Sequence, residues 1–501
     1  MKSSPNIFHR RNTEALWSAE RHYTSRTPRL RAFAVNCISI IIFSTLALPS
    51  LAQQDSTKYF SLNQYYAAIL ANHPVAKQAG LLSETARQEM RLAKGSFDPK
   101  LEAVYETKEF QDKSYYNKAD AYISVPTRSP ITPKIGFEQN RGDLLNDIDK
   151  IPGDRQFMAG LNLPIGRGLI TDERRTALKQ ATLLTSLAEA EQIKVINKLL
   201  LEAAKEYWSW YYANESYRLL TQGAAVAREI FNRVKLNQQN GEASVLDTVQ
   251  AKITWQTRQV EKQEAFVTLQ NSIITLSNFL WDDAQNPVQL RDDAQPVVPI
   301  LQTEIGQTES SSLISMAGEN HPELIKQTIK INQLEFDKKL AREFLKPRLD
   351  LSYSLLSQPY TALVFDPLND YKFDVNFSMP LFLRKERSKV ALTNIKIKNA
   401  TWERTQEQRD IVNSVASAVN EVNNSAVLIR QQQSMVESYE RLMQGELLNL
   451  ENGESDLFKI NVQQEKLIQS QLKLVKLKSA FEKQRAYVYW SAGSRNLNSN
   501  P

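Results

Sequence analysis

The sequence predicts a mainly α-helical protein that also carries amphipathic β-strands and is built from two copies of one unit. The tripeptide Asn-His-Pro occurs at 72–74 and again at 320–322, and an ungapped overlay then pairs Pro99 with Pro347 and Tyr105 with Tyr353. The 501-residue chain has only 15 glycines, and long stretches contain residues that favour helix. These observations predict two copies of a unit that combines strands with long helices.

The first 52 residues are predicted to be a removable signal peptide. A basic segment precedes an apolar run from Val35 to Leu48, and Ser50-Leu51-Ala52 supplies small residues for cleavage. A retained signal anchor is the alternative, although the run is shorter than the roughly 20 residues of a spanning helix. Cys37 is the only cysteine, and its surroundings do not suit lipid attachment. The mature chain is therefore expected to contain no cysteine.

Most of the positive charge belongs to this first segment. The whole chain has a formal net charge of +6, and residues 1–52 hold seven Lys/Arg and two Asp/Glu, which leaves +1 for the remainder. A nucleic-acid partner would need a basic face in the folded part. We therefore expect no nucleic-acid binding.

The strands expected near residues 99–165 and 347–380 have one apolar and one polar face. In the second copy Leu349, Leu351, Tyr353 and Leu355 alternate with polar residues, and Phe373, Val375 and Phe377 do the same before Pro380. The first copy shows the pattern from Leu101 to Tyr105 and from Phe157 to Leu163. This predicts four strands per chain. A further strand pair around 121–137 is left open.

Two long helical hairpins follow the strands, at 171–281 and 384–491. Each first helix of about 65 residues would be nearly 100 Å long. Both end in Asn-Gly-Glu, at 240–242 and 452–454, where the glycine suits a left-handed helix stop and Ser244 or Ser455 can cap the next helix. Residues 282–312 are predicted to be an irregular linker, so the repeats span 53–281 and 313–492, with a tail at 493–501.

Four strands do not close a membrane barrel, whose open edges would leave N–H and C=O groups unpaired in lipid. Three copies would supply twelve strands. The chain resembles the TolC-family outer-membrane efflux proteins. The resemblance lies in the duplicated unit, in the strands that end at Leu163-Pro164 and Met379-Pro380, and in the helix tips at 240–242 and 452–454. The resemblance implies a homotrimer with a twelve-stranded β-barrel in outer-membrane lipid. A long α-helical barrel would continue it through the periplasm.

The resemblance also implies partners and places contacts at the hairpin tips. The partners are a periplasmic adaptor, also called a membrane fusion protein, and an inner-membrane pump of RND or ABC type. Lys459 stands near the position at which the resemblance leads us to expect an aspartate, which weakens the assignment at the second tip. The docking residues carried over are Gly241, Ser244, Leu246, Asp247, Gly453, Ser455 and Leu457, and Glu446 and Glu451 are candidates for an acidic tunnel constriction.

Other motifs have structural explanations that are favoured over chemistry. His73 and His321 could form a metal pair, but a structural role at the start of a helix is favoured because the repeat alone explains both. The aromatic run Tyr207–Tyr212 could bind a ligand, although helix packing is favoured. No phosphate loop, metal-ligand spacing or nucleophile motif is present in the sequence. We therefore expect no enzyme activity, cofactor or metal.

The function predicted is a passive exit duct of a tripartite efflux or type I secretion system. The sequence does not distinguish these two systems. A soluble periplasmic coiled-coil scaffold is the alternative, and it would leave the strand edges unpaired.

Overall fold

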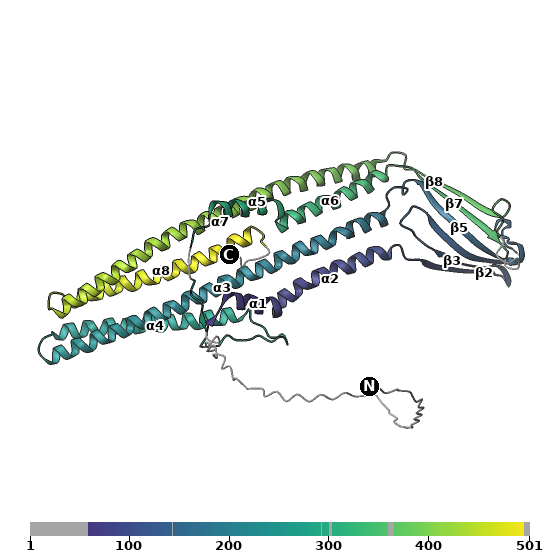
Figure 1. Ribbon diagram of the computed structural model, residues 1–501. Coiled ribbons are helices and arrows are strands. Elements are labelled where there is room, and N and C mark those ends of the chain that lie inside the picture. The colour runs from purple at the N-terminus through teal and green to yellow at the C-terminus, as the bar shows by residue number, and fades with distance from the viewer. Residues whose placement is uncertain (1–58, 143, 292, 300–302, 359–364, 495–501) are drawn as a thin grey trace, which may run out of the picture. The chain divides into compact units, whose positions relative to one another are not determined.

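The computed structural model describes residues 59–494 apart from 143, 292, 300–302 and 359–364. All of them belong to one compact unit, residues 55–501. The predicted signal segment 1–52, with Cys37, and most of the tail lie outside the described residues. Figure 1 shows the β-sheet at one end of the long helices and the two helical hairpin tips at the other.

The two repeats begin with the same order of elements, as the sequence predicts. In the first, α1 (Leu62–Asn72) and α2 (Pro74–Gly95) precede β2 (Lys100–Phe110); in the second, α5 (Gln307–Asn320) and α6 (Pro322–Glu343) precede β7 (Arg348–Ser357). Helices α2 and α6 are both 22 residues long and both begin at the proline of Asn-His-Pro. The fixed φ of proline suits this first helical position.

The sheet has six strands, which corrects the expectation of four per chain. The first repeat supplies β2, β3 (Lys113–Ser124), β4 (Thr132–Arg141) and β5 (Arg155–Gly166), and the second supplies β7 and β8 (Tyr371–Ser378). Their order in the sheet is β2-β3-β4-β5-β7-β8, and every neighbouring pair is antiparallel. The strand pair left open around 121–137 is thus present as β3 and β4. Two short 3-10 turns, η1 (Asp147–Asp149) and η2 (Pro152–Asp154), lie between β4 and β5.

Four helices connect directly to the sheet: α2 and α6 lead into it, and α3 and α7 lead out of it. Helix α3 (Glu173–Gln239) follows β5 and α7 (Arg384–Glu451) follows β8, with 67 and 68 residues as predicted. Neighbouring helices are α2 and α3, α3 and α6, and α6 and α7. Ion pairs such as Lys194–Glu323 at 2.5 Å and Lys330–Glu403 at 2.7 Å join these neighbours. The helices therefore form a row in the same order as the strands to which they connect.

The return helices α4 (Val245–Ser277) and α8 (Leu457–Ser491) pack on α3 and α7, and α8 also packs on α3. The expected linker is less irregular than predicted, because α5 begins at Gln307 and β6 (Gln295–Pro296) pairs with β1 (Tyr59–Phe60). Among the described residues, no helix combines the length and apolar composition needed to span a membrane.

The densest core lies midway along the helices. Tyr207, Trp210 and Tyr211 are at most 2% exposed and pack with Tyr65 and Leu276. The Tyr207 hydroxyl donates to the Phe60 carbonyl at 2.8 Å, and the Tyr65 hydroxyl donates to the Leu276 carbonyl at 2.9 Å. The packing role preferred for the aromatic run is therefore confirmed.

Candidate functional site

The six strands present one apolar face, because residues paired across antiparallel strands share a side of the sheet. The register places Leu101, Ile123, Ile135, Ala159, Leu355 and Tyr371 in a single row across all six strands. Neighbouring rows on this face add Ala103, Tyr105, Ala119, Ala121, Phe137, Phe157, Leu161, Leu163, Ile165, Leu349, Leu351, Tyr353, Phe373, Val375 and Phe377. From Phe157 to Ile165 the apolar run covers about 26 Å of strand. That is the scale of the apolar band of membrane barrels.

The opposite face is mainly polar. Its row next to the first contains Lys100, Ser124, Lys134, Gly160, Ser354 and Lys372. Val104, Met158 and Leu356 are apolar exceptions on this face. Its other members include Glu102, Glu106, Asp120, Tyr122, Glu138, Asn162, Arg348, Asp350, Asp374 and Asn376. A sheet with these two faces can separate lipid on one side from water on the other.

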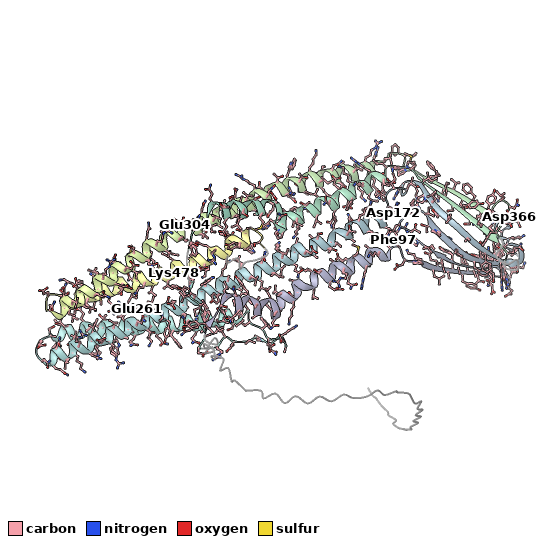
Figure 2. All side chains as sticks on the ribbon, viewed as in Figure 1. Phe97, Asp172, Glu261, Glu304, Asp366 and Lys478 are labelled. Atoms are coloured by element: carbon pink, nitrogen blue, oxygen red, sulfur yellow. The ribbon has the colours of Figure 1, made fainter. Side chains whose placement is uncertain are left out.

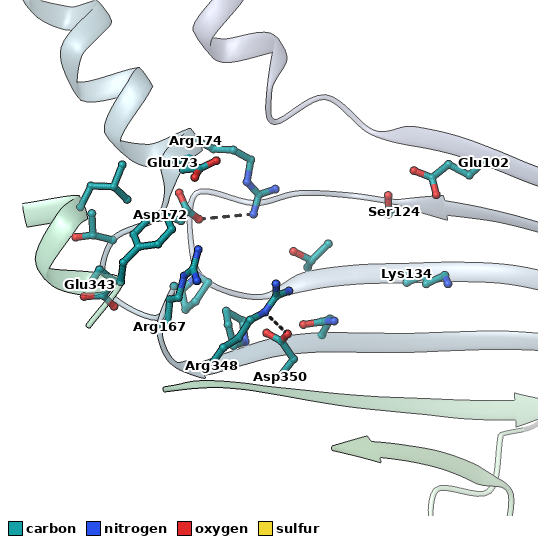
Figure 3. Close-up of a pocket in the computed structure, with 18 of the residues that line it drawn as sticks. Glu102, Ser124, Lys134, Arg167, Asp172, Glu173, Arg174, Glu343, Arg348 and Asp350 are labelled. Atoms are coloured by element: carbon teal, nitrogen blue, oxygen red, sulfur yellow. Dashed lines mark hydrogen bonds and ion pairs between the residues drawn. The ribbon is translucent and has the colours of Figure 1, made fainter. Parts of the chain in front are cut away.

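A cavity of about 650 Å³ opens on the polar face where the sheet meets α3 and α6 (Figure 3). Charged side chains of both signs line it. Arg348 and Asp350 form an ion pair at 2.5 Å, and Arg174 lies 3.7 Å from Asp172, which also caps α3. Figure 2 places Asp172 at this junction and Asp366 at the far end of the strands. The sequence patterns did not indicate this cavity.

The two hairpin tips have the same backbone geometry. Gly241 and Gly453 have φ of +81° and +76°, the left-handed conformation that glycine adopts without steric cost. The Glu242 amide donates to the Asn237 carbonyl and the Glu454 amide to the Asn449 carbonyl, both at 2.8 Å. These bonds terminate α3 and α7 in the Schellman manner, so the predicted helix-stop conformation of both glycines is confirmed.

The caps that follow the two glycines differ. Ser244 caps α4 in a capping box with Asp247, whose amide donates to the Ser244 hydroxyl at 3.0 Å. In the second tip Asp456 caps α8, and Ser455 instead donates to Glu446 at 2.7 Å. The expectation that Ser455 could cap α8 was therefore wrong, since the next residue, with a charged acceptor, takes that position.

The tips expose apolar side chains. Leu246 is 79% exposed, whereas Leu457 is half-buried and its neighbour Phe458 is 66% exposed. Phe458 was not among the predicted docking residues, although its aromatic side chain beside a capped helix start was a usable signal. The side chain of Glu451 lies outside the described residues, and Glu446 is partly buried through its bond to Ser455.

Both repeat histidines cap helices. His73 Nδ1 accepts the Val75 amide proton at 3.1 Å, and His321 Nδ1 accepts that of Glu323 at 3.2 Å. Burial lowers the pKa of both imidazoles, which keeps the accepting nitrogen unprotonated. The structural role at the start of each helix is therefore confirmed.

Comparisons with known proteins agree with this architecture. Residues 313–494 match the outer membrane efflux protein family. The CmeC outer membrane channel of Campylobacter jejuni superimposes with a TM-score of 0.61 at 14% identity, over 88% of this chain and 87% of that one. The outer membrane protein VceC of Vibrio cholerae has a TM-score of 0.60 at 14% identity, over 86% and 96%. The MtrE outer membrane channel of Neisseria gonorrhoeae, in its open state, has a TM-score of 0.60 at 13% identity, over 86% and 89%.

No curated protein sequence is detectably similar to the chain. The structural likenesses, at these low identities, establish the fold, and the family match covers the second repeat. Together with the two-faced sheet and the long helices, they show that residues 313–494 are similar to outer membrane efflux proteins and that the described chain has the fold of outer-membrane channels.

Proposed function

We propose that three copies of this chain form a passive exit duct that docks on a periplasmic adaptor and receives cargo from an inner-membrane pump. The observation that carries the proposal is the two-faced sheet, which continues directly into the row α2-α3-α6-α7. A polar inner surface would then run from the outer membrane into the periplasm. The duct needs no catalytic group of its own, because the pump supplies the energy.

Exposed apolar stripes support assembly with further copies. On α4, Leu246, Ile253, Val260, Val267 and Ile274 recur every seven residues, and all are at least 50% exposed. On α7, Leu428, Met435 and Leu442 follow the same interval and are 40–46% exposed. A seven-residue apolar repeat is the pattern by which helices pack as coiled coils. The α4 stripe of one copy therefore suits the α7 stripe of the next.

The sheet edges also favour assembly. Strands β2 and β8 end the sheet within the described chain, and both carry the apolar face. An open edge in hydrocarbon would leave a row of backbone groups unpaired, at several kcal/mol each. The scaffold alternative has no use for a membrane-sized apolar face. Efflux and type I secretion remain undistinguished, since the pump selects the cargo.

The decisive experiment is extraction from membranes and measurement of mass and conductance. The duct requires detergent, runs as a trimer by light scattering, and conducts ions in a planar bilayer. A protein that is released without detergent as a soluble monomer would refute the proposal. In intact cells, added protease should cut only in the loops distal to the helices, such as 142–154.

The adaptor is proposed to bind at the tips through Gly241, Ser244, Leu246, Asp247, Gly453, Ser455 and Leu457, with Phe458 as an added contact. Leu246→Asp combined with Leu457→Asp should abolish dye efflux in intact cells while the purified trimer stays intact. Leu368→Asp, which changes an 84% exposed leucine at the opposite end of the protein, is the matched control and should not affect efflux. Unchanged efflux in the double variant would reject docking at the tips.

An acidic constriction is proposed near the second tip through Glu446 and Glu451. Glu446 is held in place by the hydrogen bond that its carboxylate accepts from the Ser455 hydroxyl. Glu446→Gln should reduce the cation preference of the conductance, and an unchanged preference would remove Glu446 from this role.

A further inference from the structure

We propose that the barrel of this protein has eighteen strands rather than twelve, closed by pairing β2 of one copy with β8 of the next in one specified register. The inference rests on the proposed trimer, because three six-stranded sheets give eighteen strands. The strand pair β3–β4 is then part of the membrane wall.

The faces of β3 and β4 support this placement. Ala121 and Ile123 on β3 and Phe137 and Ile135 on β4 continue two rows of the apolar face without interruption from β2 to β5. Ile135 is 66% exposed in the single chain. A hairpin folded into the lumen would place this side chain in water, whereas a hairpin in the wall places it in lipid.

The width of the helix row gives a second, independent argument. Neighbouring helices lie about 8–10 Å apart, so four of them per copy occupy about 32–40 Å of the ring. Strands about 4.8 Å apart and tilted by about 35° occupy roughly 6 Å each along the ring, so six of them cover about 35 Å. Four strands would cover only about 23 Å. The estimated width of six strands is therefore closer to that of the helix row than the width of four strands is.

The register within the chain restricts how the barrel closes. A line drawn perpendicular to the strands from Lys100, the first residue of β2, arrives at Lys372, the second residue of β8. Since paired residues share a face, Lys372 must pair with an even-numbered residue of the next copy's β2. Lys372 opposite Val104, Glu106 or Lys108 pairs at least six residues of β8 and stays before the irregularity of β2 between Lys108 and Glu109, so these three registers are compared.

Charge complementarity selects Glu106. Pairing Lys372 with Glu106 forms an opposite-charge pair and also brings Ser378 opposite Lys100, so that both strands start level. Pairing Lys372 with Lys108 would place two lysines opposite each other and would also place Asp374 opposite Glu106. Pairing with Val104 would oppose Asp374 to Glu102. Directly opposed like charges destabilise a sheet, and only the Glu106 register avoids them.

The chosen register gives a shear of six residues per copy, or eighteen for the three copies. Eighteen strands with this shear tilt by about 35°, at the lower end of the range for membrane barrels. The backbone radius is then about 17 Å, about 1.5 times that of a twelve-stranded barrel at the same tilt. The outer-membrane mouth is thus as wide as the helical ring beneath it.

Disulfide cross-linking tests the register in the full-length trimer carrying Cys37→Ser. Each double variant combines Val375→Cys with one cysteine on β2. Ala103→Cys is opposite Val375 in the proposed register, whereas Tyr105→Cys and Leu101→Cys are opposite it in the two rejected registers. Oxidation should link subunits in most molecules only for Ala103→Cys, and dominant linkage through another position would overturn the register.

Charge reversal and strand counting complete the test. Lys372→Glu, which opposes two carboxylates in the proposed register, should weaken trimers against heating in detergent, and Lys372→Gln, which adds no like charge, should weaken them less; equal effects of the two changes would overturn the register. Electron cryo-microscopy of the trimer in nanodiscs should count eighteen strands, and twelve would overturn the inference. Light scattering of the unmodified protein tests the trimer separately, so a failed register leaves the proposed duct standing.

Discussion

Ile135 on β4 gives a sharp test of which strands contact lipid. Its side chain lies on the apolar face between those of Ile123 and Ala159, in the strand pair that the sequence left open. Ile135→Lys would place an ammonium group in the hydrocarbon region. Glu138→Lys introduces the same residue three positions along the strand but on the polar face, and it is the matched control.

The expected magnitude separates two placements of the hairpin. A lysine near the middle of the bilayer costs a membrane barrel about 2–4 kcal/mol. That corresponds to roughly 30- to 1000-fold in the folding equilibrium of each chain. If Ile135 instead faced water, the same change would stay within about 0.5 kcal/mol, as for most surface substitutions.

The assay is folding into lipid vesicles during urea titration, with resistance to added trypsin as the readout. Ile135→Lys should lower the urea midpoint clearly, whereas Glu138→Lys and the conservative Ile135→Leu should leave it nearly unchanged. Equal midpoints for the two lysine variants would refute the assignment of β4 to the membrane wall.

Three further predictions concern the helices. Because burial lowers the pKa of His321 in the folded chain, the unfolded chain binds the proton first as the pH falls below about 6.5. Stability should fall through that range, and His321→Asn, which keeps a capping acceptor, should reduce this dependence in thermal melts, while His73, whose pKa is lowered in the same way, maintains the remainder. Arg258, 4% exposed, lies 2.7 Å from Glu261 and also pairs with Glu465 on α8. Arg258→Ala should cost about 1–3 kcal/mol in denaturant unfolding, since Glu465 is partly exposed and can rehydrate; no loss would mean that the clamp between α4 and α8 is dispensable. Gly241→Ala should cost about 1–2 kcal/mol because its φ is +81°, whereas Gly445→Ala inside α7, where an added Cβ meets open space, should be neutral or stabilising; equal effects would contradict the left-handed assignment.

The repeat made much of the fold predictable. The matched prolines at 74 and 322 mark the first residues of two 22-residue helices, and the apolar alternation from Leu349 to Leu355 reports the faces of β7 correctly. These signals are local, because a proline fixes its own φ and a two-sided strand alternates with period two. Glycine after a long helical run predicted both tips for the same reason.

The hairpin β3–β4 was harder to predict because its alternation is weak. The apolar face of β3 uses the small residues Ala119 and Ala121, and β4 contains Pro133 and Gly136, which usually indicate a loop. Gly136 is required where the strands approach closely, since an added Cβ would lie 2.8 Å from the Tyr122 Cβ. The cavity beside Arg348 and Asp350 depends on residues from both repeats, and only the folded sheet brings these together.

Thiol labelling along β3 tests the central claim, that this sheet is a wall between lipid and water, most directly. Single cysteines are placed at each residue from Lys118 to Ile123 in a Cys37→Ser background, and the trimer is reconstituted into vesicles. We expect a lipid-soluble maleimide to label positions 119, 121 and 123, and a membrane-impermeant one to label 118, 120 and 122. Uniform labelling of all six positions by the water-soluble reagent would contradict the account.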